Sequence, residues 1–328
     1  MKGKAQPYDS RVLTPEGWTF FGELAVGDKV IGSDGKSTQI TGVFPRGKRQ
    51  TFRVEFDDGF GVEVSDDHLW RVLDERSGEY STISTKNLLR INGCEGDLLR
   101  WSIPLVRPVT FDLICTLPMD PYLFAIFVGC GSLERDGVIF KLPPQHREEI
   151  LSKFDSNKIK VENDLFSVDL DSWSFLKKYH ESQIIPDVYL QSSIANRLRF
   201  VQGIFDTSGW ISSDFVVCSW ISPNFKFIPQ LVELIQSLGG IATHDQHLHQ
   251  LRATFPPDIC PFSIQELEKQ FQSMTKIVPR RRIHSIRPCR LTDVLCISVD
   301  AEDHLYVTDH FIVTHNTIQV SNYSLQLS

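Results

Sequence analysis

Short strand-like segments at both ends of the chain enclose a middle part with helical periodicity. Near the amino end, residues 12–18 read as strand, turn and strand. Residues 51–56 and 61–65 flank the sequence Asp57-Asp58-Gly59, a hairpin signal. The carboxyl end returns to short strands at 282–287, 293–299, 305–308 and 311–314. This pattern predicts one β domain split by an insert, rather than two domains in series.

The middle of the chain predicts an α+β insert. An apolar helical run begins at Pro121, and the ranges 225–238 and 264–274 also have helical spacing of their apolar residues. A strand-like stretch at 215–221 lies between helices. We expect this segment to extend from about residue 112 to residue 280.

Composition excludes several classes of protein. Hydrophobic residues make up 41% and charged residues 23% of the 328, as in ordinary globular proteins. No apolar run reaches the about 18 residues of a membrane span, and residues 1–10 lack the apolar core of a signal peptide, so we expect a cytoplasmic monomer without a membrane segment. The net charge of −7 argues against a dedicated nucleic-acid binder. None of the seven cysteines forms a C-x-x-C pair, which argues against zinc sites and a disulfide framework.

The sequence His315-Asn316-Thr317 permits a specific self-cleavage. The side-chain nitrogen of Asn316 can attack its own carbonyl carbon, which forms a succinimide and breaks the bond to Thr317. His315 can act as general acid or base in this step. The hydroxyl of Thr317 can serve as a nucleophile. In isolation, such a tripeptide is more often a polar turn after a strand.

The residues on the outer sides of two suspected cuts form a known motif when they are joined. Gly3-Lys4 joined to Thr317-Ile318-Gln319 reads Gly-Lys-Thr-Ile-Gln. This is the end of a P-loop, in which the Lys meets phosphates and the Thr hydroxyl binds Mg²⁺. The match falls at the two boundaries where splicing would cut, and it indicates a P-loop ATPase host, such as a helicase-like protein.

Four blocks of the sequence, in order and with matching spacing, resemble those of inteins, whose β-rich splicing domain has the Hint fold. They are residues 5–13, 62–70, 294–307 and 309–316. The resemblance implies scissile bonds at Lys4–Ala5 and Asn316–Thr317. The implied division is 1–4 for the preceding host segment, 5–111 and 281–316 for the Hint domain, 112–280 for the insert and 317–328 for the following host segment.

Departures from the usual intein pattern indicate a particular mechanism. Position one of the first block is Ala5, where a nucleophilic Cys or Ser is usual. Cys296 stands where Asp is common, and Trp70 and Thr314 complete a set that resembles the third mechanistic class of inteins. In that class an internal Cys replaces the missing first nucleophile. A decayed intein would explain Ala5 but not the other three residues together.

The resemblance implies roles around the first bond to break. Cys296 attacks the carbonyl carbon of Lys4 while His68 protonates the leaving nitrogen of Ala5. Ser65 holds the amide or its oxyanion. Trp70 is expected to pack beside Cys296, with Thr314 hydrogen-bonded nearby.

The later steps are also implied by the resemblance. Thr317 accepts the acyl group, and Asn316 then cyclises with help from His315. The base that activates Cys296 is either His304 or His68, and the sequence leaves both open. Splicing needs no metal and no cofactor.

Residues 123–131 and 201–209 resemble the paired helices of LAGLIDADG homing endonucleases. Small residues at Ala125, Gly129, Gly203 and Thr207 would let two helices pack closely. Such enzymes hold Mg²⁺ with a carboxylate before the final Gly of each motif.

Cys130 and Ser208 occupy those two places, and Ser182-Gln183 stand where a Lys is usual. We therefore expect a degenerate nuclease that would use Mg²⁺ only if it were active. Residual DNA binding is expected through Arg280, Arg281, Arg282 and the sheet of the insert.

Three other readings compete with splicing. A DNA-cleaving homing endonuclease is disfavoured by the two missing carboxylates. A P-loop ATPase is disfavoured because no contiguous P-loop motif is present. A related Hint domain that transfers its acyl group to a sterol or another nucleophile is disfavoured by His315-Asn316-Thr317.

Overall fold

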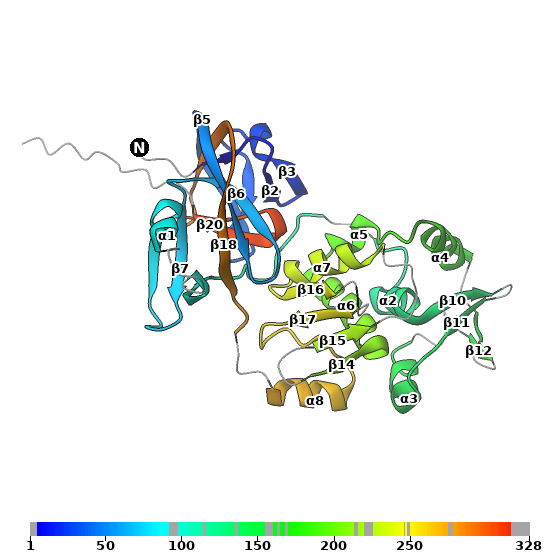
Figure 1. Cartoon of the computed structure of the whole chain (residues 1–328). Coiled ribbons are helices and arrows are strands. Elements are labelled where there is room, and N and C mark those ends of the chain that lie inside the picture. Colours follow the sequence, from blue (N-terminus) through cyan, green and yellow to red (C-terminus); the bar gives the residue numbers. More distant parts are fainter. Residues whose placement is uncertain are drawn as a thin grey trace, which may run out of the picture. The chain divides into compact units, whose positions relative to one another are not determined.

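The chain divides into two compact units. Figure 1 is coloured along the sequence, so that unit 1 appears in blue to cyan and again in orange to red, and unit 2 mainly in green to yellow. Unit 1 comprises residues 1–107 and 280–328, and unit 2 comprises residues 108–279. The computed structural model describes residues 5–91, 98–113, 116–134, 137–154, 160–162, 165–167, 170–212, 216–219, 226–245, 247, 250–274 and 278–315. The first unit is thus interrupted in sequence by the second. Unit 2 begins four residues before the expected insert of 112–280 and ends one residue before its end.

Unit 1 is mostly β. Its strands are β1 (Gln6–Pro7), β2 (Arg11–Thr14), β3 (Gly17–Phe20), β4 (Lys29–Ile31), β5 (Ser37–Phe56), β6 (Gly61–Ser65), β7 (Leu69–Asp74), β8 (Tyr80–Ser84), β9 (Trp101–Ile103), β18 (Arg281–Val299), β19 (Leu305–Thr308) and β20 (Ile312–His315). One sheet has the order β4-β5-β18-β9-β7-β8, with β1 added on β18 and β6 on β5, and a second has the order β20-β19-β2-β3. The helix α1 (Thr85–Ile91) follows β8.

Both expected hairpins near the amino end are confirmed. Strands β5 and β6 pair antiparallel around the turn that contains Gly59, whose φ of 83° favours glycine. Strands β2 and β3 pair in the same way, and Gly17 has a φ of 117°. The local turn chemistry therefore fixes these two connections.

The long pair β5–β18 joins the two sequence halves of unit 1. Its register runs from Ile283 opposite Phe56 to Val299 opposite Ile40. The sequence predicted two separate strands, 282–287 and 293–299, within this region. The structure joins them into one strand with a register shift between Pro288 and Leu291, because pairing with β5 continues past the proline that cannot donate a backbone hydrogen bond.

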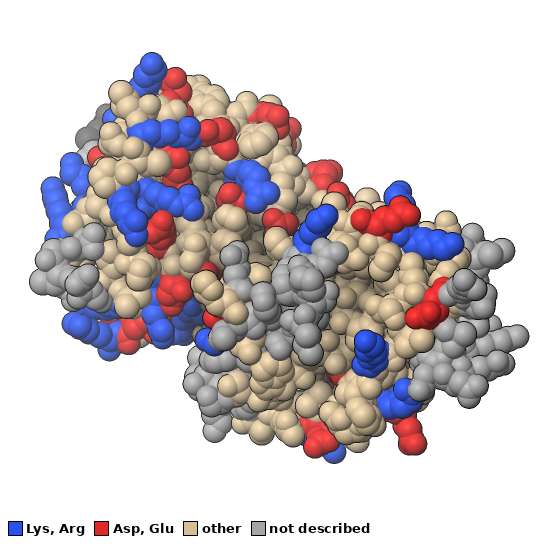
Figure 2. All heavy atoms as spheres, turned by 45° about the vertical axis from the view of Figure 1, so that its right-hand side comes forward, with Lys and Arg blue, Asp and Glu red and all other residues tan. Residues whose placement is uncertain are grey.

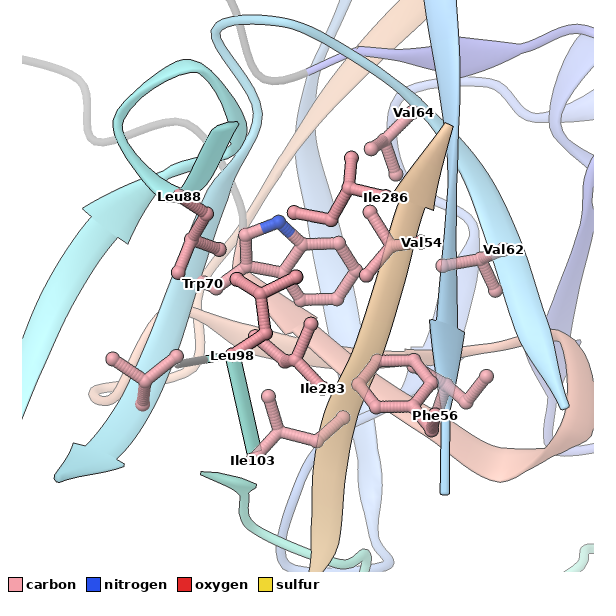
Figure 3. Close-up of a cluster of buried hydrophobic side chains, with 12 residues drawn as sticks. Val54, Phe56, Val62, Val64, Trp70, Leu88, Leu98, Ile103, Ile283 and Ile286 are labelled. Atoms are coloured by element: carbon pink, nitrogen blue, oxygen red, sulfur yellow. The ribbon is translucent and has the colours of Figure 1, made fainter. Parts of the chain in front are cut away.

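The main core of unit 1 surrounds Trp70, which is fully buried (Figure 3). Apolar side chains from both sequence halves surround the indole, among them Leu88, Phe56, Ile283 and Ile286. Burial of one such large side chain stabilises the fold by roughly 1.5–3 kcal/mol. The core therefore binds the two halves of the split domain to each other.

Unit 2 contains two four-stranded sheets and seven α-helices within the described residues. The sheets have the orders β10-β11-β13-β12 and β14-β15-β17-β16. Their strands are β10 (Gly131–Glu134), β11 (Gly137–Phe140), β12 (Lys160–Glu162), β13 (Leu165–Ser167), β14 (Gly209–Ile211), β15 (Val216–Ser219), β16 (Ile241–Asp245) and β17 (Gln250–Thr254). The helices are α2 (Pro121–Cys130), α3 (Arg147–Leu151), α4 (Leu170–Ser182), α5 (Asp187–Leu190), α6 (Ile194–Ser208), α7 (Ile228–Ser237) and α8 (Gln265–Met274).

The predicted helix pair of the insert is confirmed as α2 and α6. Asp120 caps α2 by accepting hydrogen bonds from the backbone of the first turn. A Cβ atom added at Gly203 would lie 2.5 Å from the carbonyl oxygen of Tyr122 and 2.7 Å from Cβ of Ala125. Small residues therefore permit the close approach of these two helices. The predicted segments 215–221, 225–238 and 264–274 correspond to β15, α7 and α8.

Among the described residues, no helix combines the length and the apolar character that a membrane crossing requires. The predicted fold class, a mostly β domain split by an α+β insert, is confirmed.

Candidate active site

Ala5 lies against Cys296 in the interior of unit 1. Strand β1 pairs antiparallel with β18, so that Gln6 is opposite Leu295 and Pro7 is opposite Val294. Ala5 is 1% exposed and Cys296 is 0% exposed, and both belong to one apolar cluster with Val294 and Phe44. The strand pairing thus brings the two ends of the sequence together at the predicted thiol nucleophile.

Ser65 holds Ala5 by two hydrogen bonds. The backbone N–H of Ala5 donates to Oγ of Ser65 at 3.2 Å, and the backbone N–H of Ser65 donates to the carbonyl oxygen of Ala5 at 2.9 Å. The hydroxyl of Ser65 in turn donates to Oδ1 of Asp67 at 2.6 Å. Of the two roles expected for Ser65, the structure shows contact with the amide.

His68 is buried between two residues that the sequence grouped with it. Its Nε2 forms a hydrogen bond with Oγ1 of Thr314, which is 1% exposed. Its ring centroid lies 4.9 Å from that of Trp70, in an edge-to-face arrangement. The indole N–H of Trp70 donates to Oγ1 of Thr85 at 3.0 Å. Trp70 and Thr314 therefore fix the ring of His68 from two directions.

The expected position of Trp70 beside Cys296 stays a prediction. Trp70 belongs to the core cluster in Figure 3, whereas Cys296 belongs to the cluster with Ala5. The ring contact of Trp70 on this side is with His68.

His304 and His315 lie side by side. Their ring centroids are 6.2 Å apart and nearly parallel, at 28°. His315 is 5% exposed and pairs with Leu305 across β19 and β20. His304 has a φ of 58° at the end of a turn that its backbone N–H closes on Ala301. The turn and the pairing together place His304 next to the predicted carboxyl-side cut.

Three predicted site residues, Lys4, Asn316 and Thr317, lie outside the described residues. The nearest described positions are Ala5 and His315, one at each predicted cut.

A buried phenol lies close to the thiol. Burial raises the pKa of Tyr306 well above its usual value, and the charge of a Cys296 thiolate raises it further. The hydroxyl of Tyr306 donates to Oε1 of Gln6 at 3.4 Å. Tyr306 is therefore neutral at physiological pH and offers the site a polar but uncharged neighbour.

The predicted degenerate positions of the insert end its two central helices, Cys130 on α2 and Ser208 on α6. Burial raises the pKa of Cys130 to about 12. Asp206 is 2% exposed and accepts hydrogen bonds from the hydroxyls of Tyr122 and Ser263. Burial also raises the pKa of Asp206. These residues do not fit a Mg²⁺ site, and the described part of the chain has no group of three or more His, Cys, Asp or Glu arranged to hold a metal.

The expected DNA contact through Arg281 is wrong. This side chain is 1% exposed and forms an ion pair with Asp58 at 2.6 Å, because β18 turns it into the interior of unit 1. Arg280 instead forms an ion pair with Glu75 at 3.4 Å. On the face in Figure 2, Lys and Arg side chains lie among Asp and Glu side chains. Because Arg281 is buried and Arg280 is paired with Glu75, the run Arg280–Arg282 does not form a continuous basic patch.

No protein-family model matches the chain. The chain is 25% identical over 350 residues to the replicative DNA helicase DnaB of Mycobacterium intracellulare. The match covers 96% of the chain, which spans 59% of the length of that relative.

Similar solved structures include a crystal structure of the MchDnaB-1 intein, with 13% identity, coverage of 94% of this chain and 98% of that chain, and a TM-score of 0.35. A crystal structure of a variant of I-DmoI in complex with its target DNA has 12% identity, coverage of 42% of this chain and 89% of that chain, and a TM-score of 0.30.

Two residues of the site were not singled out from the sequence. Asp67 was counted only as part of the block around His68, although Ser-x-Asp spacing in a turn permits its hydrogen bond to Ser65. Thr85 is the first residue of α1, and the sequence contains no signal that its hydroxyl accepts a hydrogen bond from the indole N–H of Trp70.

Proposed function

We propose that this chain is a self-splicing intein in which Cys296 begins the reaction. The observation that carries the proposal is the burial of Ala5 against Cys296, with the Ala5 amide held by Ser65. Ala5 has no nucleophile of its own, and the thiol lies beside it. The four intein-like blocks meet in one unit, which agrees with their having a common task.

The first step transfers an acyl group to sulfur. Sγ of Cys296 attacks the carbonyl carbon of Lys4, the Lys4–Ala5 bond breaks, and a thioester forms. The thiol proton goes to a base and the nitrogen of Ala5 takes up a proton, so none is consumed overall. An unperturbed thiol has a pKa of about 8.5, and the reaction therefore needs a base near it. His68, held by Thr314 and Trp70, supplies the proton to the leaving nitrogen.

The second stage joins the flanking segments. Oγ of Thr317 attacks the thioester, releases the thiol of Cys296 and forms an ester. Asn316 then cyclises and breaks its bond to Thr317, assisted by His315. The freed amine of Thr317 displaces the ester oxygen, which leaves an amide between Lys4 and Thr317. None of these steps requires a metal or a cofactor.

The parallel pair of His304 and His315 supports a division of labour between the histidines. Because His304 lies beside His315, it acts at the carboxyl-side cut and shares the proton transfers of Asn316 cyclisation. His304 is then not the base that activates Cys296. Of the two histidines that the sequence left open, the proposal therefore assigns this role to His68.

The host protein is a helicase-like P-loop ATPase. Support comes from the sequence Gly-Lys-Thr-Ile-Gln across the two cuts and from the similarity to a protein named replicative DNA helicase DnaB. The partners of the chain are the covalently joined host segments. The excised chain is a cytoplasmic monomer that has no membrane partner.

Intact mass of a purified precursor tests the proposal. The wild type should release residues 5–316 and the joined host segments, whereas Cys296→Ala should yield no joined product. The variant Cys289→Ala, which changes an exposed cysteine on the same strand, is the matched control and should splice like the wild type. Asn316→Ala should stop carboxyl-side cleavage and trap the branched ester on Thr317. Joined product from Cys296→Ala at the wild-type rate would overturn the proposal.

A further inference from the structure

The hydroxyl of Ser65 has one hydrogen and two acceptor lone pairs to distribute. Its hydrogen is directed to Oδ1 of Asp67, at an oxygen–oxygen distance of 2.6 Å. The N–H of Ala5 donates to Oγ of Ser65 at 3.2 Å. Ser65 is 0% exposed and Ala5 is 1% exposed, whereas Asp67 is half-buried.

A charged acceptor decides how the hydroxyl is oriented. Hydrogen bonds to a carboxylate are roughly twice as strong as those between neutral groups. The hydrogen of Ser65 therefore stays on Asp67, and a lone pair of Oγ faces the amide of Ala5. In this orientation Ser65 accepts from the scissile N–H and cannot donate to an oxyanion.

We propose that Asp67 is a positioning residue for the amino-side cleavage and that it acts through Ser65; this inference rests on the proposed splicing function. Ser65 binds both the N–H and the carbonyl oxygen of Ala5. The nitrogen that must leave Lys4 is thus held in one orientation. Holding its N–H fixes the direction in which its lone pair emerges as the amide breaks, and thus where a proton must be delivered.

The turn that carries Asp67 supplies a matched control. Asp66 is its neighbour, and the carbonyl oxygen of Asp66 accepts a hydrogen bond from the N–H of Lys86 at 2.7 Å. The turn itself is closed by the N–H of His68, which donates to the carbonyl oxygen of Ser65 at 3.2 Å. Asp66→Ala therefore removes a carboxylate from the same turn without removing the acceptor of Ser65.

The first experiment isolates amino-side cleavage in a full-length precursor that carries both Thr317→Ala and Asn316→Ala, so that the acyl group stays on Cys296. Thioester formation is measured by intact mass after cleavage with dithiothreitol. Asp67→Ala should lower the rate about tenfold, the equivalent of roughly 1.4 kcal/mol in the barrier, and Asp66→Ala should leave it unchanged. Asp67→Asn should recover part of the rate, because its amide oxygen still accepts from Ser65.

The second experiment separates positioning from a general loss of structure. In the Cys296→Ala precursor, cleavage after Asn316 should proceed at the same rate with and without Asp67→Ala. In a double-mutant cycle, Asp67→Ala should have no further effect on thioester formation once Ser65→Ala is present.

Three outcomes would overturn the role of Asp67. These are an unchanged rate in Asp67→Ala, an equal loss of both cleavages, or an undiminished effect in the Ser65→Ala background. If Asp67→Ala fails to fold by circular dichroism, the comparison of Asp67→Asn with Asp66→Asn decides in its place. If the parent precursor forms no thioester that depends on Cys296, the splicing proposal itself falls, and that result is distinct from all three.

Discussion

His68 and Thr314 are separated by 246 positions in the chain, yet Nε2 of the one and Oγ1 of the other form a buried hydrogen bond. His68 follows the turn after β6, and Thr314 belongs to β20 near the end of the chain. The bond therefore exists only when the two sequence halves of unit 1 have assembled. An insert can separate the halves in sequence without separating the two members of this pair.

Replacement of Thr314 tests what this bond contributes. Thr314→Val keeps the shape of the side chain but removes the hydroxyl, so the ring of His68 loses a partner worth about 1 kcal/mol. We expect amino-side cleavage to slow by about five- to tenfold, with a smaller effect on cleavage after Asn316. Thr314→Ser retains the hydroxyl and should stay near the wild-type rate. Equal rates for the Val and Ser variants would show that the bond has no role in the reaction.

The sequence predicts local elements of this fold well because local chemistry determines them. The hairpins around Gly17 and Gly59 require glycine at a positive φ, and helix α2 begins where Asp120 caps it and Pro121 fits its first turn. The pairing of the two helices of the insert was implied by the resemblance, and the small residues explain why they can pack closely. The signals for the hairpins and for the start of α2 lie within a few residues of the structure that they specify.

Positions that depend on strand order were not predicted from the sequence. Trp70 and Cys296 belong to one sequence signature, and the structure places them in different apolar clusters. Arg281 belongs to a basic run, and its burial follows from the face of β18 that it occupies. Both depend on long-range pairing, for which a single sequence gives no direct signal.

The ion pair of Arg281 and Asp58 predicts a large loss of stability when one partner is removed. The side chains are 1% and 2% exposed, and Arg281 also donates to the carbonyl oxygen of His310 at 2.7 Å. Asp58→Ala leaves a buried guanidinium without its counter-charge and should lower the free energy of unfolding by about 3–5 kcal/mol.

The control is Asp9→Ala, which breaks the exposed pair with Arg290 and should cost less than about 1 kcal/mol. Urea unfolding followed by tryptophan fluorescence measures both variants. Similar losses of unfolding free energy in Asp58→Ala and Asp9→Ala would contradict the larger contribution assigned to the buried pair.

The close approach of α2 and α6 predicts a graded response to added methyl groups. A Cβ atom at Gly203 would overlap backbone, which cannot move freely, whereas one at Gly129 would lie 3.1 Å from Oγ1 of Thr207, which can turn away. Gly203→Ala should therefore destabilise unit 2 by about 1–3 kcal/mol, and Gly129→Ala by clearly less. Thermal unfolding of the full chain compares the two, and the reverse order would contradict the packing.

The insert should not cleave DNA. Mg²⁺ requires hard oxygen ligands, and a thiol whose pKa is raised to about 12 stays protonated at neutral pH and offers none. The wild-type chain, incubated with Mg²⁺ and a duplex that encodes the uninterrupted host sequence, is expected to leave the duplex intact. Specific nicking would show that carboxylates other than those of the expected motif positions hold the metal.

His310 predicts a dependence of stability on pH. Burial lowers the pKa of His310; Arg11 and Arg281 lower it further, while Asp309 and Asp58 oppose the shift. Since the pKa in the folded state lies below that of the unfolded state, about 6.5, the unfolded chain binds more protons in the window between the two values. The stabilising contribution of neutral His310 is therefore complete above about pH 6.5 and is lost as the pH falls through the folded-state pKa.

His310→Asn tests this dependence, because asparagine tolerates the φ of 56° and carries no titrating ring. The difference in free energy of unfolding between wild type and variant should be constant at pH 7 to 8 and should move against the wild type between pH 6.5 and 5, and a difference that is independent of pH would contradict the role of His310.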